Sequence, residues 1–251
     1  MEFKIIWKSS RAVCIELVEE GIVYTDNYTV FIDGEPMLTS DRVVQSIYGL
    51  KPDTEYRLTL SRGDHTSAEM TFRTEPEFVT LNVRDFGAMG DDVHNDTLAI
   101  QAAILSCPPH SRVYVPEGIY KVSSLFMKSG IIFELGKGAV LSAYTDRTYF
   151  PILPGLIQSY DEASEYNLAS WEGNPLDSFA SIITGIGVSD VTICGEGCIE
   201  GNASYENWWE GEGRKKTGGA FRPRSIFLNR CKDVTIQGIS IKNSPAWTVH
   251  P

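Results

Sequence analysis

The chain has 251 residues, 42% of them hydrophobic, which is enough apolar side chains for one large or two modest folded domains. Its formal net charge of −11 opposes attraction to nucleic acid and to anionic membrane surfaces, so we expect neither as a partner. The first residues lack an apolar signal-peptide core, and no run is long enough to span a membrane. These features favour a cytoplasmic protein; an exported or periplasmic protein whose signal has been removed is the alternative.

Residues 1–76 have the pattern of a small antiparallel β-sandwich. Short runs of β-branched and aromatic residues are separated by turn sequences such as Asp33-Gly34. The sequence Glu75-Pro76-Glu77 then predicts a linker, because proline lacks a backbone donor and stiffens the chain. We expect strands at residues 3–8, 12–17, 28–32, 42–48, 55–61 and 69–73.

The next segment predicts a turn followed by one short helix. The acidic run 91–96 does not fit a calcium-binding loop, because Val93 stands where a second ligand is needed, so we interpret it as a structural turn. Asn95 or Asp96 can cap a helix that ends before Pro108. Such a helix can plug the open end of a β-coil. Its apolar positions are Leu98, Ile100, Ala103, Ile104 and Leu105.

The rest of the chain predicts a stacked coil of short strands. A run that begins near Ile182 recurs near Ile226, an offset of 226 − 182 = 44, and Phe227 lies 21 residues before Thr248. We infer a repeat of 21–22 residues, with the first two runs two turns apart and a further strand at 247–249. Strands this short and β-branched predict a parallel β-helix. Earlier strands are expected at residues 113–115, 119–122, 125–127, 131–135 and 139–141.

Two features interrupt this rhythm and are candidates for ligand binding. The loop at about 144–179 either walls a groove or packs on the coil. Trp208 and Trp209 can stack on sugar rings, and nearby cations can hold carboxylates; alternatively the tryptophans close the side of the coil and the cations are solvated. The cations are Arg214, Lys215, Lys216, Arg222 and Arg224. The five cysteines form no Cys-x-x-Cys pair and favour buried thiols, so we expect no metal and no cofactor.

Two stretches resemble known families. The sequence from Leu50 to Tyr56, followed by Phe72-Arg73-Thr74, resembles a fibronectin type III module, which implies that Tyr56 packs its ring in the core and bonds its hydroxyl to nearby backbone. Residues 79–251 resemble the N-terminal part of polygalacturonases, the pectin-degrading glycoside hydrolases of family 28. The residues that carry this second resemblance are Asp85 to Ile104, Cys198 to Asn202, Trp208-Trp209, Arg222 to Ile226 and Asn243 to Pro251.

The resemblance implies an all-β chain: a fibronectin III-like sandwich, then the first turns of a right-handed parallel β-helix with a capping helix. It implies inverting hydrolysis of α-1,4-linked galacturonan, with galacturonan or oligogalacturonide as the partner and no calcium. The family's Asn-Thr-Asp and Gly-His-Gly motifs are absent from this sequence. We therefore assign no catalytic residue, expect the catalytic carboxylates beyond Pro251, and expect the remainder of the chain to complete the β-helix.

His250 is the candidate nearest to those motifs. It either lies beneath the substrate groove or is a core or turn histidine. The predicted substrate-binding residues are therefore His250, Arg222, Arg224, Trp208 and Trp209. The competing hypotheses are a β-helix lyase of the pectate lyase type, which works by proton abstraction, and a non-catalytic β-helix that binds carbohydrate.

Overall fold

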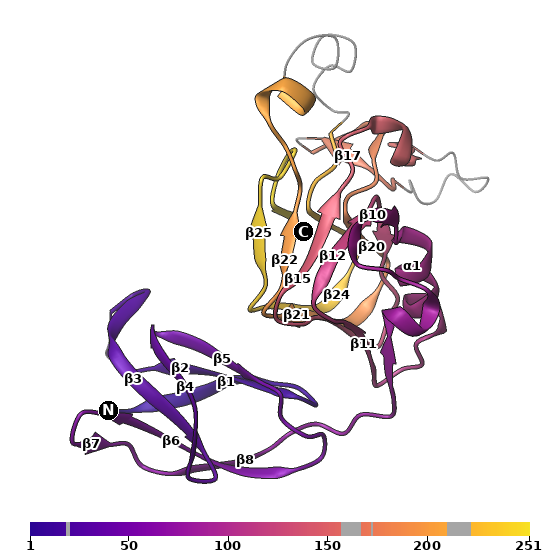
Figure 1. The fold of residues 1–251 in the computed structure, drawn as a ribbon. Helices are drawn as coiled ribbons and strands as arrows, with labels where there is room; N and C mark the ends of the chain where they lie inside the picture. The colour runs from indigo at the N-terminus through magenta and orange to yellow at the C-terminus, as the bar shows by residue number, and fades with distance from the viewer. Residues whose placement is uncertain (19–20, 157–166, 172, 210–221) are drawn as a thin grey trace. The chain divides into compact units, whose positions relative to one another are not determined.

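The computed structural model describes residues 1–18, 21–156, 167–171, 173–209 and 222–251. The chain divides into two compact units, Met1–Phe78 and Val79–Pro251, each with an apolar core of its own (Figure 1). Across these ranges, no helix combines the length and the hydropathy needed to cross a membrane.

The first unit consists of two antiparallel sheets around one core. Alternating residues of the strands point inward, for example Val13 and Ile15 from one sheet and Leu58 and Leu60 from the other, all fully buried. One sheet has the order β1 (Phe3–Lys8), β2 (Ala12–Leu17), β5 (Val44–Tyr48). The other has the order β4 (Glu35–Arg42), β3 (Tyr24–Ile32), β6 (Glu55–Arg62), β7 (His65–Thr66), and β8 (Met70–Arg73) also pairs with β6.

The six strands predicted for this unit are all present, with ends shifted by up to four residues. The sequence failed to predict the two-residue strand β7 and the longer strand β4. Its residues are mostly exposed and polar, and it contains Pro36, which is unfavourable inside a sheet. Because β4 pairs only with β3 in that sheet, it lies at an edge, where a proline is tolerated.

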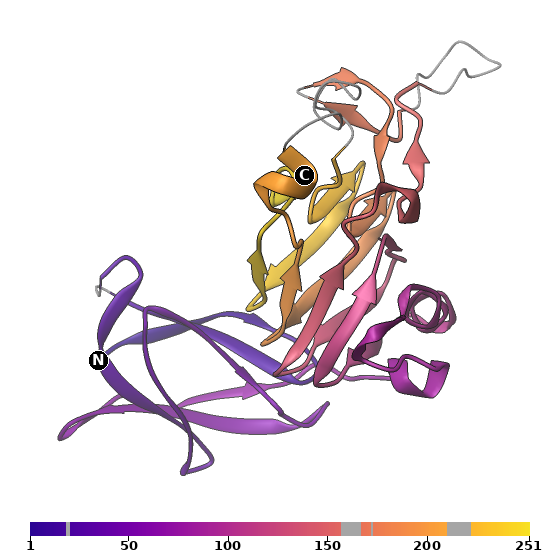
Figure 2. The same cartoon turned by 45° about the horizontal axis from the view of Figure 1, so that its top comes forward.

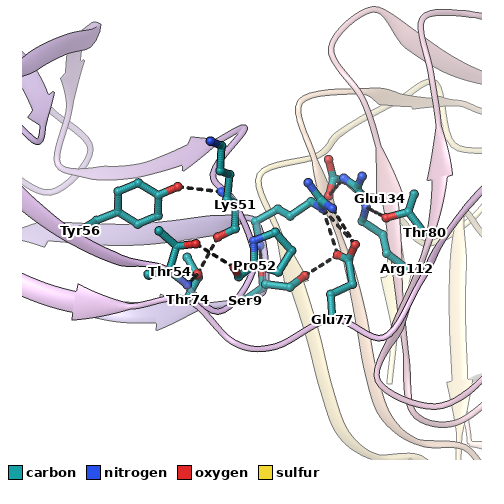
Figure 3. Close-up of polar contacts among 12 residues, drawn as sticks. Ser9, Lys51, Pro52, Thr54, Tyr56, Thr74, Glu77, Thr80, Arg112 and Glu134 are labelled. Atoms are coloured by element: carbon teal, nitrogen blue, oxygen red, sulfur yellow. Dashed lines mark hydrogen bonds and ion pairs between the residues drawn. The ribbon is translucent and has the colours of Figure 1, made fainter.

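Tyr56 fixes the turn that precedes β6, as predicted. Its hydroxyl accepts a hydrogen bond of 2.8 Å from the backbone N–H of Lys51 (Figure 3). Its ring lies 5.8 Å from the ring of Phe72. The buried Thr74 supports the same turn: its Oγ1 donates to the carbonyl of Lys51 and accepts from the N–H of Thr54. These bonds hold residues 51–56 against the end of β8.

Residues 75–77 do not form a free linker. Glu77 accepts hydrogen bonds from the Arg11 guanidinium, at 2.9 and 3.0 Å, and from the Ser10 hydroxyl at 2.8 Å, and its side chain is only 3% exposed (Figure 3). The N–H of Glu75 also donates to the carbonyl of Ser9. The segment predicted as a linker is therefore bonded into the first unit.

The second unit is a coil of three parallel sheets (Figure 2). From β11 (Ser111–Val115) onward each turn places one strand in each sheet, whereas the first turn has a strand in two of the sheets and is followed by helix α1 (Thr97–Ser106). All strand pairs of these sheets are parallel. This arrangement is a parallel β-helix. The first sheet holds β9 (Thr80–Asn82), β11 (Ser111–Val115), β14 (Ile131–Leu135), β21 (Ser189–Gly195) and β24 (Lys232–Gln237); the second holds β10 (Asp91–Asn95), β12 (Gly118–Val122), β15 (Ala139–Ala143), β22 (Cys198–Glu200) and β25 (Ser240–Lys242); the third holds β13 (Leu125–Phe126), β20 (Ile183–Ile186), β23 (Ile226–Asn229) and β26 (Val249–His250).

Two long insertions leave the coil at the same corner, between the second-sheet strand and the third-sheet strand of a turn. We call this the insertion corner. This corner is short in two turns: it holds residues 123–124 in the turn of β12 and residues 243–248 in the turn of β25. In the two turns between them it is long and holds residues 144–182 and residues 201–225. The first insertion carries η2 (Arg147–Tyr149) and the short strands β16 (Ile152–Leu153), β17 (Ser170–Trp171), β18 (Asn174–Pro175) and β19 (Ser178–Phe179); the second carries η3 (Tyr205–Trp209).

Asparagine side chains fasten successive turns together at this corner. The amide of Asn202 donates to the carbonyl of Ala143 in the preceding turn, at 2.8 Å, and the amide of Asn243 donates to Glu200 at 2.9 Å. Both asparagines have a positive φ, which asparagine tolerates better than most residues. A side chain on the neighbouring Gly201 would collide with the backbone carbonyl of Asn243. The points where the insertions leave the coil are therefore fixed.

The structure corrects the predicted repeat. Ile183 pairs directly with Ile226, 43 residues away, so these runs belong to adjacent turns and not to turns two apart. The predicted spacing holds where the insertion corner is short: β11 and β14 are 20 residues apart. Phe227 pairs with His250 rather than Thr248, a two-residue shift that keeps the same face of the strand. An offset in sequence does not distinguish an extra turn from a loop that leaves the coil.

The predicted helix is present as α1 (Thr97–Ser106) and packs against η1 (Val83–Phe86), β12 and β13 (Figure 1). Ile100, Ala103 and Ile104 join the apolar core, but Leu98 and Leu105, predicted to face it, are 81% and 62% exposed. The helix therefore closes an early turn of the coil with a narrow apolar face.

The turn predicted before this helix is instead the exposed strand β10, which pairs irregularly with β12. Asp96 is the residue that precedes the helix, but its buried carboxylate makes no cap bond. It accepts from the backbone N–H groups of Met89 and Gly90, at 2.6 and 3.0 Å, and Asn95 accepts from Thr97 in its place. Asp96 thus fixes the loop that leads into β10.

Replacing Tyr56 with Phe should lower the free energy of unfolding of the first unit by about 1 kcal/mol, because the Lys51 N–H loses its acceptor while the ring contact remains. Urea denaturation of the two variants Tyr56→Phe and Tyr24→Phe measures this. Tyr24 is exposed and Phe preserves its stacking with Arg42, so the control should match the wild type. Equal stability of all three proteins would contradict the role given to Tyr56.

Replacing Asp96 with Asn should destabilise the second unit by about 1–3 kcal/mol. Asparagine has an NH₂ group in place of one carboxylate oxygen, so the backbone N–H of Met89 or of Gly90 would lose its acceptor. Thermal unfolding is the measurement. Asp92→Asn is the matched control, since Asp92 makes an exposed ion pair of 3.0 Å with Lys121, and such pairs contribute under about 1 kcal/mol. A larger effect at Asp92 than at Asp96 would refute this interpretation.

Candidate functional site

A cavity of about 460 Å³ opens at the insertion corner. Its lining comes from three successive turns: the insertion that carries β17, the insertion that carries η3, and the short corner before β26. Because parallel strands stack about 4.8 Å apart, residues far apart in sequence meet there. The lining residues are Trp171, Trp209, Arg222, Ala246, Trp247 and Thr248.

Three tryptophans give the cavity flat apolar walls. The rings of Trp171 and Trp247 lie 4.7 Å apart, tilted by 52°, and Trp209 and Trp247 are 38% and 39% exposed. Indole faces of this kind bind the apolar face of a sugar ring or another flat group. The walls therefore suit a flat or ring-shaped ligand.

The charge at the cavity has the opposite sign to that of the whole chain. The Arg222 guanidinium lies 3.9 Å from the ring centre of Trp209 and 5.6 Å from that of Trp171. Among the described lining residues Arg222 is charged and none is acidic. In a chain with a net charge of −11, this is a local basic site that can attract an anion. A guanidinium fork also matches the geometry of a carboxylate.

Arg224 lies behind this wall and is only 1% exposed. Its guanidinium is 5.5 Å from the ring centre of Trp171, 5.2 Å from Trp247 and 4.8 Å from Phe227. Its Nη2 donates to the carbonyl of Ser170, while its Nε is buried without a hydrogen-bond partner in the described structure. Burial lowers the pKa of Arg224 to about 10, so it stays protonated at neutral pH.

His250 lies on β26, next to the cavity but not in its lining. Its ring packs edge-on against Phe227 and Trp247, with ring centres 5.4 and 5.3 Å apart. Burial, and then the positive charge of Arg224, hold the pKa of His250 below its ordinary value of 6.5. The imidazole is therefore mainly neutral at pH 7 and supports the wall from behind.

Trp208 does not lie at the cavity. It is 1% exposed, its ring meets Phe150 edge-on at 6.0 Å, and the guanidinium of Arg147 covers it at 4.5 Å. Trp208 was predicted either to bind substrate or to close the side of the coil, and its burial favours the second. Of the predicted cations, Arg214, Lys215 and Lys216 lie outside the described residues.

Sequence reasoning did not assign Trp171 and Trp247 to the site. Trp247 was expected in a strand, but β26 begins at Val249, so Trp247 lies in the corner. Trp171 lies in the loop predicted to wall a groove or to pack, and it does line the cavity. The only sequence feature that pointed to Trp171 as a site residue was its place in this loop, since nothing in the sequence brings Trp171 next to Trp247.

The described lining of the cavity consists of aromatic, small and hydroxyl side chains and one guanidinium. Within the ranges that the structure describes, no group of three or more His, Cys, Asp or Glu side chains is placed to hold a metal ion. The class defined by fold and site is a parallel β-helix with an aromatic and cationic cavity on its flank.

Comparison with known proteins agrees with this class. Residues 80–145 match the family model described as rhamnogalacturonase A/epimerase, pectate lyase-like, and residues 161–250 match that of glycosyl hydrolases family 28. An exo-poly-alpha-D-galacturonosidase of Dickeya chrysanthemi is 29% identical over 80% of this chain and 33% of its own length. A probable polygalacturonase of Vitis vinifera is 28% identical over 77% of this chain and 39% of its own.

Among solved structures, a family 28 exopolygalacturonase of Yersinia enterocolitica is similar with a TM-score of 0.67 and 21% identity, over 98% of this chain and 55% of that one. This likeness shows a shared fold. The chain spans between 33% and 39% of the length of the two curated relatives. Together the matches show that the second unit is similar to glycosyl hydrolases of family 28, polygalacturonases among them.

The lowered pKa of His250 predicts a pH dependence of stability. The unfolded chain binds the proton of this histidine more tightly than the folded chain does, so the stability is fully present above pH 6.5 and is lost as the pH falls below 6.5 and through the lower pKa of the folded state. Melting temperatures measured from pH 7 downward should show this loss, and His250→Asn should reduce its slope. His65→Asn, on the exposed strand β7, should leave the slope unchanged. An identical slope in His250→Asn would contradict the prediction.

Proposed function

We propose that the protein is a polygalacturonase-like glycoside hydrolase that acts on α-1,4-galacturonan, and that the cavity at the insertion corner binds one of its galacturonate units. The observation that carries this proposal is the combination of indole walls with the guanidinium of Arg222 in the cavity lining, on a chain with a net charge of −11. A neutral sugar needs no such cation, whereas a uronic acid does. The match of residues 161–250 to the family 28 model supports the same reaction class.

Recognition of a galacturonate unit at this cavity has two parts. The sugar ring packs on the faces of Trp171, Trp209 or Trp247, which removes apolar surface from water. The carboxylate meets the guanidinium of Arg222, and a charge-assisted pair of this kind contributes more than a neutral hydrogen bond. Arg224 and His250 support the wall without lining it.

Hydrolysis with inversion requires an acid and a base roughly 6.5–9.5 Å apart on opposite sides of the scissile bond. We assign neither to this chain, because the Asn-Thr-Asp and Gly-His-Gly motifs that the resemblance leads us to expect do not occur in it. The proposal is that residues 1–251 bind galacturonan and supply neither the acid nor the base of the reaction. The share of the relatives' length that the chain spans, 33% and 39%, supports this.

We further propose that the first unit is a fibronectin type III-like module and that the β-helix is right-handed. A three-stranded sheet β1-β2-β5 facing a sheet in which β4, β3, β6 and β8 pair is the division of strands expected for such a sandwich. The hydrogen bond from Lys51 to Tyr56 supports the same assignment.

Arg222→Met should weaken binding of trigalacturonic acid by the intact protein about 10- to 100-fold, because a hydrogen-bonded charge pair is lost. Binding of an uncharged galactose trimer should change little. Titration calorimetry measures both. Lys232→Met removes the same charge from the exposed start of β24 and should bind as the wild type does.

The products distinguish the reaction classes. New reducing ends without an unsaturated product support hydrolysis. Absorbance from a new double bond would instead indicate a lyase. Binding without turnover by a longer chain that includes the family's acid and base motifs would indicate a non-catalytic carbohydrate-binding β-helix. Equal affinity of wild type and Arg222→Met for trigalacturonic acid would refute the binding site proposed here.

A further inference from the structure

Arg224 is held rigidly in the coil although its side chain has little to bond with. Its backbone carbonyl accepts from Ile182 of the preceding turn at 3.0 Å, and the next residue, Ser225, donates to the carbonyl of Trp247 in the following turn at 3.3 Å. The main chain at Arg224 is therefore fixed between two rungs. Its guanidinium is buried, and no ion pair between it and an acidic residue is found in the described part of the chain.

A buried cation without a counter-ion is unfavourable, so its position needs a compensating interaction. The contacts that Arg224 makes are with aromatic faces and one carbonyl. It lies within 5.5 Å of the ring centres of Trp171, Trp247 and Phe227 and donates to Ser170. Cation–π contacts of this length are favourable, and they gain strength when water is excluded.

These contacts join parts of the molecule that lie far apart in the sequence. Trp171 lies on β17, whose strand partner is β18 of the same insertion. Trp247 lies in the corner of a later turn. Arg224 touches both rings and also holds the carbonyl of the residue before Trp171. It therefore connects the insertion to the coil at the place where the two cavity walls meet.

We propose that Arg224 is the positioning residue of the cavity: it holds Trp171 beside Trp247 so that the aromatic walls exist before a ligand arrives, and it does so without touching the ligand. The role in binding rests on the proposed function, whereas the placement of the two rings does not. A lysine does not replace it, because an ammonium lacks the planar face that stacks on the rings while donating to Ser170. Preformed walls spare the ligand the cost of ordering the insertion.

The first experiment concerns the ligand-free protein. Two indole rings 4.7 Å apart give a coupled circular-dichroism signal, and Trp171→Ala defines the spectrum without it. Arg224→Lys should lose most of this signal, whereas Arg230→Lys, a matched change at an exposed position just after β23, should retain it. Retention of the full signal in Arg224→Lys would overturn the proposal, whatever the protein binds.

The second experiment is a double-mutant cycle on binding of trigalacturonic acid. Arg224→Lys should weaken binding about tenfold in the wild-type background, the size of one lost cation–π contact, and less than about twofold in the Trp171→Ala background, because its effect passes through that ring. Additive losses would mean that Arg224 contacts the ligand itself, which would also overturn the proposal.

The two experiments distinguish a failure of the proposed function from a failure of the role proposed for Arg224. If the wild type does not bind trigalacturonic acid, the proposed function fails and the circular-dichroism result still decides whether Arg224 positions the rings. If Arg224→Lys does not fold, Arg224→Gln replaces it, since its planar amide can still donate to Ser170. A ring-coupling signal equal to that of the wild type in Arg224→Gln, together with unchanged affinity, would then overturn the inference.

Discussion

The constraint on which the second unit depends is the parallel backbone ladder of its three sheets. Each turn must return to the same three lines of hydrogen bonds, so residues in excess of one turn have to leave at a corner. Both long insertions leave at the same corner of successive turns, and the amides of Asn202 and Asn243 fasten that corner to the turn before. Trp171 and Trp247, which are 247 − 171 = 76 positions apart in the sequence, therefore line one cavity. The ladder determines where the insertions begin and end, and their side chains determine what the cavity can bind.

The sequence was sufficient to predict the β-helix and most of its strands, because short β-branched runs bounded by turn residues are a local signal. The sequence did not correctly predict how many turns of the coil separate the two similar runs. The offset between the runs near Ile183 and Ile226 is close to twice the spacing of β11 and β14, and only the pairing shows that a loop accounts for the difference. Of the two residues predicted as helix caps, Asn95 accepts from the N–H of Thr97, whereas the carboxylate of Asp96 accepts from a loop 6 residues earlier in the sequence.

The candidate site was predictable in composition and not in geometry. Arg222 and Trp209 were identified as binding residues and both line the cavity, whereas the adjacent Trp208 is buried in the core. Neighbouring residues of a helical turn point in different directions, so a Trp-Trp pair does not reveal which ring is accessible. Trp171 reaches the site only through the tertiary position of its insertion, for which the sequence holds no local signal.

The balance of charge at the insertion corner explains why the wall contains a buried arginine at all. An apolar residue at position 224 would pack against Trp171, Trp247 and Phe227 without the desolvation penalty of a cation, and replacing buried ions in this way is often neutral or stabilising. Stability alone therefore does not favour Arg224. What an apolar residue lacks is the bond to the Ser170 carbonyl and a positive charge next to the cavity. Both serve the same end, because one holds the insertion in place and the other favours an anion in a chain that is otherwise strongly negative.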